Sequence, residues 1–306
     1  MKIVRSRPPA DSHPRSDPHI QQIADAVSED YLRGCVEKIA VPRHAVFEEE
    51  ANRAAGKWIS DEFRRFGLNT FEQGKYGNVV GMVGEDFTRV QVLVGAHFDT
   101  VPRSPGADDN GSAVAAMLCA ASILTEIAEG QVAFIAFNRE EDGLLGSDDF
   151  VRNFLGKRKH GLQLVHVLEM VGYCDETPGS QQAPPGMPVR LGDTGNFIGM
   201  LSNRHSNDLV TSVLEVGSMV VPALPIVGLK IFAGVERLFP HLLRSDHSPF
   251  WSAGIPALMW TDTAEFRNPN YHLPSDLPDT LDYGFLARFT QLLVAQICAF
   301  LQLRDR

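Results

Sequence analysis

Three groups of polar residues follow apolar runs of this chain, and their side chains could bind a divalent cation. The first is His97-Phe98-Asp99 after the run 90–94, the second is the acidic loop 106–112, and the third is Glu140-Glu141 after the run 132–137. In an open α/β sheet a site is built where the strands end. An imidazole and several carboxylates that meet there form a ligand set for Zn²⁺ or a similar ion. The pattern predicts a metallohydrolase.

Two of these groups suggest a division of labour between neighbouring side chains. His97 and Asp99 are two residues apart, so on an extended segment both point to one side. The Asp99 carboxylate can then hold one imidazole N–H while the other ring nitrogen binds metal. Glu140 and Glu141 are adjacent and should point in opposite directions. One of them can bind metal while the other acts as a base above the substrate.

The acidic loop supplies the expected bridging ligand, Asp109. A carboxylate can give one oxygen to each of two dications and so hold them close together. Gly106 and Gly111 allow the backbone to turn tightly enough to present this side chain. The neighbouring Asp108 could serve as the bridging ligand instead, but its expected role is to support the loop.

A further carboxylate and a second imidazole complete the set. Glu169 ends the apolar run 164–168, where an acid is costly to bury unless it is paired or bound to metal. His272 follows a predicted strand and a rigid Pro-containing loop, which makes it the best candidate for the second imidazole; His247 is its rival. His166 lies on the opposite face of its strand and is expected to be a core or surface histidine.

The spacing of apolar residues predicts the elements that must position these side chains. The run 20–39 is expected to form one amphipathic helix, the runs 78–83 and 90–94 two paired strands, and Ser147 the N-cap of a helix. Strands alternating with helices predict a three-layer α/β/α fold with a mixed, mostly parallel central sheet. The other expected elements are helices at 48–66, 112–127, 203–216 and from Phe285 to Phe300, and strands at 131–137, 162–170 and 255–261.

Composition limits the domain organisation and the partners. Residues 1–18 are expected to be a disordered arm and residues 19–306 one domain, because no linker or repeat divides them. The net charge of −10 argues against nucleic-acid and anionic-membrane partners. We expect no bilayer-spanning run, no secretory signal and no disulfide among the four scattered cysteines, and hence a cytoplasmic protein.

Together these motifs resemble the zinc aminopeptidase family that includes bacterial leucyl and broad-specificity aminopeptidases. Glutamate carboxypeptidase II, the transferrin receptor ectodomain and the glutaminyl cyclases are its distant relatives. The resemblance runs from about Asn78 to the C-terminal helix. It rests on Gly95-Ala96-His97-Phe98-Asp99, Gly106-Ala107-Asp108-Asp109-Asn110-Gly111, Phe137-Asn138-Arg139-Glu140-Glu141-Asp142-Gly143-Leu144-Leu145-Gly146-Ser147, Leu168-Glu169-Met170-Val171-Gly172-Tyr173 and Tyr271-His272.

The resemblance implies a single zinc-exopeptidase-like domain with two zinc ions. Asp109 would bridge them, with Glu140 as the general base. In addition to Asp109, one ion would bind His97 and Glu169, and the other would bind Glu141 and His272. Many members of the family have Asp where this chain has Glu169, and the extra methylene shifts the carboxylate.

The implied activity is that of an aminopeptidase, a metal-dependent exopeptidase that hydrolyses the N-terminal bond of a peptide or small amide with a free amine. Tyr271 is a candidate donor to the oxyanion, with packing as its other possible role. The segments 177–199 and 233–245 are expected to wall the side-chain pocket. The first alternative is an acyltransferase of glutaminyl-cyclase type. A metal-free binding protein is disfavoured because every ligand type is present.

Overall fold

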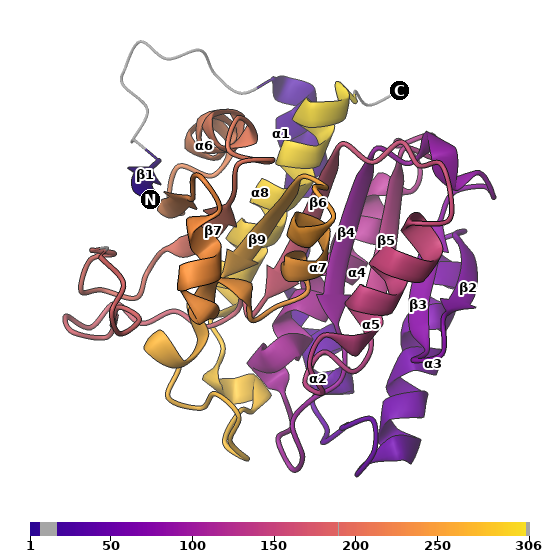
Figure 1. Cartoon of the computed structure of the whole chain (residues 1–306), viewed down its shortest axis with the longest axis horizontal. Coiled ribbons are helices and arrows are strands. Elements are labelled where there is room, and N and C mark those ends of the chain that lie inside the picture. Colours follow the sequence, from indigo (N-terminus) through magenta and orange to yellow (C-terminus); the bar gives the residue numbers. More distant parts are fainter. Residues whose placement is uncertain (7–16, 189, 304–306) are drawn as a thin grey trace.

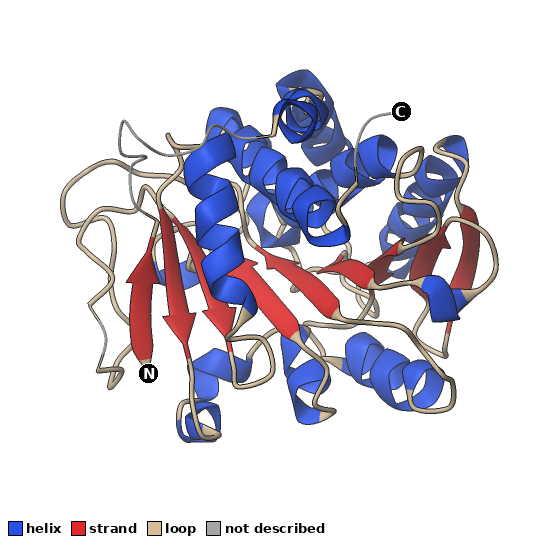
Figure 2. Cartoon of the chain, turned by 90° about the horizontal axis from the view of Figure 1, so that it is seen from above, coloured by secondary structure: helices blue, strands red, loops and turns tan. Residues whose placement is uncertain are grey.

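The apolar runs form the strands of one nine-stranded mixed sheet with helices on both faces (Figures 1 and 2). The computed structural model describes residues 1–6, 17–188 and 190–303. The spatial order of the strands is β1-β8-β7-β9-β6-β4-β5-β3-β2. Their bounds are β1 Lys2–Arg5, β2 Asn69–Gln73, β3 Asn78–Met82, β4 Val92–His97, β5 Val132–Phe137, β6 Leu164–Glu169, β7 Ile198–Ser202, β8 Ile226–Lys230 and β9 Ala257–Thr261.

The centre of the sheet is parallel and its flanks are not. Strands β5, β4, β6 and β9 are neighbours in that order and all run the same way. The β7–β8 pair is also parallel, whereas β1–β8, β2–β3, β3–β5 and β7–β9 are antiparallel. The expected mixed sheet is therefore confirmed, with its parallel block in the middle. The carboxyl ends of β4, β5, β6 and β9 consequently meet at one edge.

Successive side chains of a strand point to opposite faces of the sheet, and each face has its own hydrophobic core. In β5, Val132, Phe134 and Ala136 point to one core, and Ala133, Ile135 and Phe137 point to the other. The helices of the first core are α1 Pro18–Asp25, α2 Glu29–Ile39, α3 Glu49–Arg65, α4 Ala113–Leu124, α6 Leu209–Val220 and α8 Tyr283–Leu301. The second core is covered by α5 Leu145–Asp149, a following turn of helix and α7 His247–Ser252.

Three predictions about local structure are wrong. The run 20–39 forms two helices, because the Ser28 hydroxyl caps α2 by accepting from the Tyr31 amide at 3.2 Å. Strand β3 does not pair with β4; it lies antiparallel to β5, which separates them. Ser147 does not cap a helix, since α5 begins at Leu145 and the Ser147 hydroxyl donates to the Leu144 carbonyl.

The start of the chain also differs from expectation. Residues 2–5, predicted to belong to a disordered arm, form β1 at the sheet edge, while residues 7–16 lie outside the described residues. The strand is held because Met1 and Ile3 pack against the second core. Arg5 adds hydrogen bonds to the carbonyls of Arg190 and Leu191, at 3.1 and 2.9 Å.

The last helix passes the length and composition test for a membrane span, although no such run was expected. Of the described helices, α8 is the one that is long and apolar enough to cross a membrane, and 61% of its most apolar 18-residue stretch is buried inside the protein. It docks on the sheet as predicted: Phe289 packs against Trp260 of β9, and Gln296 contacts His166 of β6 at 2.8 Å. The four cysteines are free, as expected.

Candidate metal centre

The predicted ligands gather at the edge where the parallel strands end. His97 is the last residue of β4 and Glu169 the last of β6, its neighbour in the sheet. Glu140 and Glu141 lie just beyond β5, on the other side of β4. Strand order therefore brings together side chains that are up to 72 residues apart in sequence.

Five of the predicted residues form two groups that share Asp109. In the first, His97 Nε2 lies 3.5 Å from Asp109 Oδ1 and 3.5 Å from Glu169 Oε2. In the second, His272 Nε2 lies 3.1 Å from Asp109 Oδ2 and 3.4 Å from Glu141 Oε1. Zinc–ligand bonds are about 2.0–2.2 Å, so ligands of one ion lie roughly 3–4 Å apart. Each group has the spacing that one zinc ion requires.

Unsatisfied atoms provide an independent test of this fit. His97 Nε2, Asp109 Oδ1 and Glu141 Oε1 are buried and lack a hydrogen-bond partner among the described residues. Buried polar atoms without partners are costly and need an explanation. All three belong to the two groups, and all three are atoms that zinc accepts as ligands. The donor set therefore fits divalent zinc.

Proton affinities in the cluster point the same way. Burial lowers the pKa of His272, but the neighbouring carboxylates of Asp109 and Glu141 outweigh that effect and raise the pKa to about 10. Burial and the charge of Asp109 raise the pKa of Glu141 to about 7. At His97, the charges of Glu169 and Glu140 overcome burial and hold the pKa well above its usual value. Without a cation these ligands retain protons, which a metal ion would displace.

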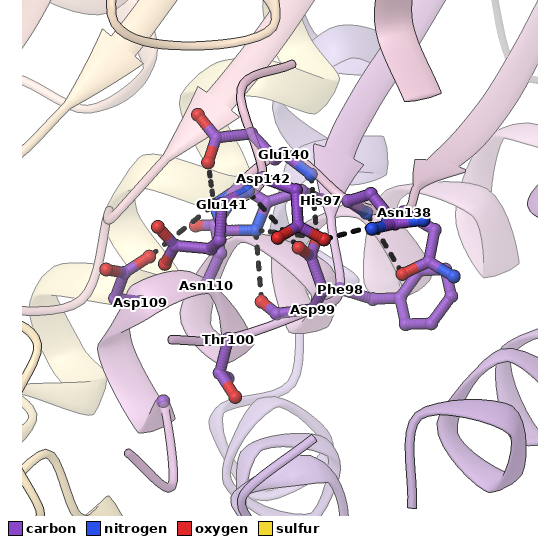
Figure 3. A network of polar contacts seen from close by, with 12 residues as sticks. His97, Phe98, Asp99, Thr100, Asp109, Asn110, Asn138, Glu140, Glu141 and Asp142 are labelled. Atoms are coloured by element: carbon purple, nitrogen blue, oxygen red, sulfur yellow. Dashed lines mark hydrogen bonds and ion pairs between the residues drawn. The ribbon is translucent and has the colours of Figure 1, made fainter. Parts of the chain in front are cut away.

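Asp99 contacts His97, as expected, and also supports the acidic pair. His97 Nδ1 lies 3.1 Å from the Asp99 backbone carbonyl and 3.5 Å from its carboxylate. The same carboxylate accepts from the backbone N–H groups of Glu140 and Glu141, at 3.1 and 3.2 Å (Figure 3). It therefore fixes the backbone of the acidic pair after β5. Burial raises the pKa of Glu140, which is 8% exposed, well above its usual range.

The bridging loop is held by a carboxylate that local sequence patterns do not identify. Asp276 accepts from the backbone N–H groups of Asp108 and Asp109, at 2.9 and 3.0 Å. Gly106 has φ +59°, and a Cβ there would lie 2.2 Å from the Asp109 carbonyl oxygen. A Cβ on Gly111 would lie 2.8 Å from the Gly106 carbonyl, so both predicted glycines are required. Asp108 supports the loop by accepting from the Gly172 amide.

The other candidates lie at or near the cluster in distinct settings. Ser245 donates to Glu169 Oε2 at 2.7 Å. Tyr271 stacks on His272 with ring centroids 3.7 Å apart, and its hydroxyl accepts from Arg244 at 2.7 Å. The Tyr271 hydroxyl proton is thus free to point elsewhere.

Two other histidines singled out in the sequence, His247 and His166, are outside both groups. His247, the rival second imidazole, is buried in α7, where its Nε2 lies 2.9 Å from the Leu242 carbonyl. His166 is a core histidine as predicted, since its ring nitrogens contact Gln296 and Trp260. Burial lowers the pKa of each histidine to about 4.

A cavity of about 490 Å³ opens directly on the metal ligands. Its floor includes Leu201, Leu229 and Met259, from three adjacent strands. Residues of both predicted segments line it, namely Pro184, Met187, Leu191, Phe197 and 241–245, whereas their contact with a substrate side chain stays a prediction. The end at the metal ligands is polar, with Glu140, Glu169 and His272; the ion pair of Arg244 and Glu265 also lines the cavity, and most of the remaining lining is apolar.

Comparisons with known proteins agree with this geometry. The family model described as Peptidase family M28 matches residues 78–212 and 233–297. The uncharacterized protein YfbL of Escherichia coli is 31% identical over 270 residues, which cover 81% of this chain and 80% of YfbL.

Solved structures share the fold. BSAP, a zinc aminopeptidase from Bacillus subtilis, has 25% identity and a TM-score of 0.56 over 75% of this chain and 50% of its own. Legionella pneumophila LapA aminopeptidase has a TM-score of 0.72 at 20% identity, over 92% and 74% of the two chains. Porphyromonas gingivalis glutaminyl cyclase has a TM-score of 0.64 at 20% identity, over 90% and 99%.

Proposed function

The chain belongs to peptidase family M28, and from that premise we propose that it is a zinc aminopeptidase that uses two ions and prefers large apolar N-terminal residues. The observation that carries this proposal is the apolar cavity, which ends at two ligand groups sharing one carboxylate. His97, Asp109 and Glu169 would hold one ion, and Asp109, Glu141 and His272 the other.

Zinc bound there supplies a Lewis acid that polarises the scissile carbonyl and acidifies the attacking water. Glu140 is the proposed general base. Its carboxylate lines the cavity, and its Oε2 lies 4.0 Å from His97 Nε2. Glu140 takes the proton as the water oxygen bonds to the carbonyl carbon, and gives it to the amine nitrogen as the C–N bond breaks.

The remaining polar groups orient the substrate. The carboxylates at the polar end of the cavity attract the free α-amine of a peptide, which favours exopeptidase action. Tyr271 lines the cavity and is the proposed donor to the developing oxyanion, because its hydroxyl accepts from Arg244 and so keeps its own proton available. The apolar floor and walls accept the side chain of the first residue.

A glutaminyl-cyclase-type acyltransferase is the second candidate, favoured by the shared fold of the cyclase structure. In that reaction the substrate's own amine attacks its side-chain amide and ammonia leaves. The 25% identity to the zinc aminopeptidase BSAP favours hydrolysis instead.

A panel of aminoacyl fluorogenic substrates, with an N-terminal Gln peptide beside it, tests both candidates. We expect release from Leu, Met and Phe substrates to exceed release from Gly and Asp substrates, and none from N-acetyl-Leu. Release of ammonia from the Gln peptide without cleavage of any aminoacyl substrate would overturn the aminopeptidase proposal.

A further inference from the structure

A buried arginine that does not line the cavity contacts the segments that carry the metal ligands. Arg43 follows α2, and none of its surface is exposed. A buried guanidinium is costly unless its donors are satisfied. Its acceptors are five backbone carbonyls: Phe98 at 2.5 Å, Pro105 at 2.5 Å, Ile39 at 3.0 Å, Gly106 at 3.0 Å and Val41 at 3.2 Å.

Two of these contacts lie in segments that present ligands. Phe98 is the residue between His97 and Asp99, and Gly106 begins the loop that turns to Asp109. One rigid planar group therefore spans the β4 end and the bridging loop. The backbone N–H of Arg43 also donates to Thr100 Oγ1 at 3.0 Å, which adds a second tie to the β4 end.

Asn52 of α3 extends this connection to the third ligand segment. Its Nδ2 donates to the Arg43 carbonyl at 2.9 Å and to Asn138 Oδ1 at 3.0 Å. Asn138 Nδ2 donates back to Asn52 Oδ1 at 3.0 Å. Because Asn138 lies two residues before Glu140, these contacts reach the segment that carries the acidic pair. Asn52 and Asn138 are both buried.

We propose that Arg43 and Asn52 are positioning residues that set the spacing of the zinc ligands on the segments after β4 and β5 and on the bridging loop. The inference rests on the proposed function. The guanidinium geometry is essential here, because its five N–H groups point outward in a plane toward carbonyls on separate segments. A lysine keeps the charge but has three donors on one nitrogen, which cannot span them.

The experiment compares zinc affinity with folding stability in the whole protein. Arg43→Lys is freed of metal, checked for folding by circular dichroism, and titrated with zinc against a chelator. We expect zinc affinity to fall about ten- to a hundredfold, the usual effect of losing an outer partner of metal ligands. A purely structural role would lower the melting temperature of the metal-free protein while leaving zinc affinity intact. Wild-type zinc affinity in Arg43→Lys would overturn the proposal.

Asn52→Ala tests the same proposal should Arg43→Lys fail to fold. Asn207 offers a matched control: it is buried, donates to the Ile231 carbonyl at 2.7 Å and contacts the Ser202 hydroxyl at 2.8 Å, on strands without ligands. Asn52→Ala should weaken zinc binding and Asn207→Ala should not. Equal zinc affinities in the two variants would contradict the proposal. If wild-type protein binds zinc but cleaves no aminoacyl substrate, the proposed function fails alone, since the affinity comparison needs no activity.

Discussion

The two ligand groups of the candidate metal centre lie on different kinds of secondary structure. In the first, His97 and Glu169 are the final residues of adjacent parallel strands, and the His97 side chain is 1% exposed. In the second, Glu141 and His272 lie on loops, and the His272 side chain is 34% exposed. His272 also has a left-handed backbone, with φ 59°, which costs energy in a non-glycine residue. The histidines set the two groups apart, since the glutamate side chains are similarly buried, with Glu169 12% and Glu141 9% exposed. We call the first group the buried half and the second the accessible half, with Asp109 shared between them.

Each half has its own support. Ser245 donates to Glu169 in the buried half, while Asp99 holds the Glu140-Glu141 backbone in the accessible half. Asp276 fixes the loop that carries the shared ligand. Both halves have ligands that are held by neighbouring residues, but only the buried half has ligands that are themselves part of the sheet. Metal exchange should therefore differ between the halves.

The largest expected effect separates the base from the ligand beside it. Glu140→Gln keeps the shape of the side chain but cannot accept a proton, so kcat should fall by roughly two to four orders of magnitude. Its zinc content should remain near wild type. Glu141→Gln should instead lose the ion of the accessible half, because a neutral amide is a poor ligand for a dication. Measuring kcat and metal content for both variants gives the test; zinc loss in Glu140→Gln with retention in Glu141→Gln would reverse the two roles.

A smaller effect should appear in the order in which zinc leaves. Chelator should remove zinc from the wild-type protein in two phases, the faster from the accessible half. His272→Ala should abolish the fast phase and His97→Ala the slow one. Loss of an outer partner of a metal ligand lowers metal affinity about ten- to a hundredfold. Loss of the ligand itself, in His272→Ala or His97→Ala, should lower zinc affinity by at least as much. Loss of the slow phase in His272→Ala would contradict the comparison.

Much of this arrangement is predictable from sequence because strand ends concentrate function. The runs before His97, Glu140 and Glu169 are apolar and β-rich, and parallel strands place their ends together. The supporting contacts are not predictable in this way. Asp276 reaches Asp109 across 167 residues, and Arg43 reaches Gly106 across 63, with no local signal in either case.

Errors in the predicted fold have the same origin. The runs 78–83 and 90–94 look like a hairpin because they are close in sequence, yet β5 pairs between them. The strand at residues 2–5 forms because the edge of β8 accepts it, which its own composition does not reveal. Long-range pairing overrides local preference in both cases.

The smallest expected effect tests the rigidity of the buried half. Strand β6 ends in Glu169 and carries His166, whose ring nitrogens contact Gln296 and Trp260 in the core. Burial lowers the pKa of His166 to about 4. Between pH 6.5, the ordinary pKa of histidine, and about pH 4, His166 is protonated in the unfolded state but neutral in the folded state. The free energy of unfolding therefore falls as the pH falls through this window. At pH 5 the loss is about 2 kcal/mol relative to pH 8.

His166→Gln should remove that loss from the pH dependence of the free energy of unfolding, measured with urea at pH 8 and pH 5. His19→Gln, on the exposed surface of α1, is the control. A pH dependence unchanged in His166→Gln would show that this histidine is not held neutral in the core.

The central claim is that five side chains hold two zinc ions through the shared carboxylate of Asp109. Its most direct test is elemental analysis of protein purified without chelator and then reconstituted with zinc. We expect two zinc ions per chain in the reconstituted wild-type protein, and one in His272→Ala. A wild-type value that stays at one or below would contradict the two-ion centre, with Glu169 the first ligand to re-examine.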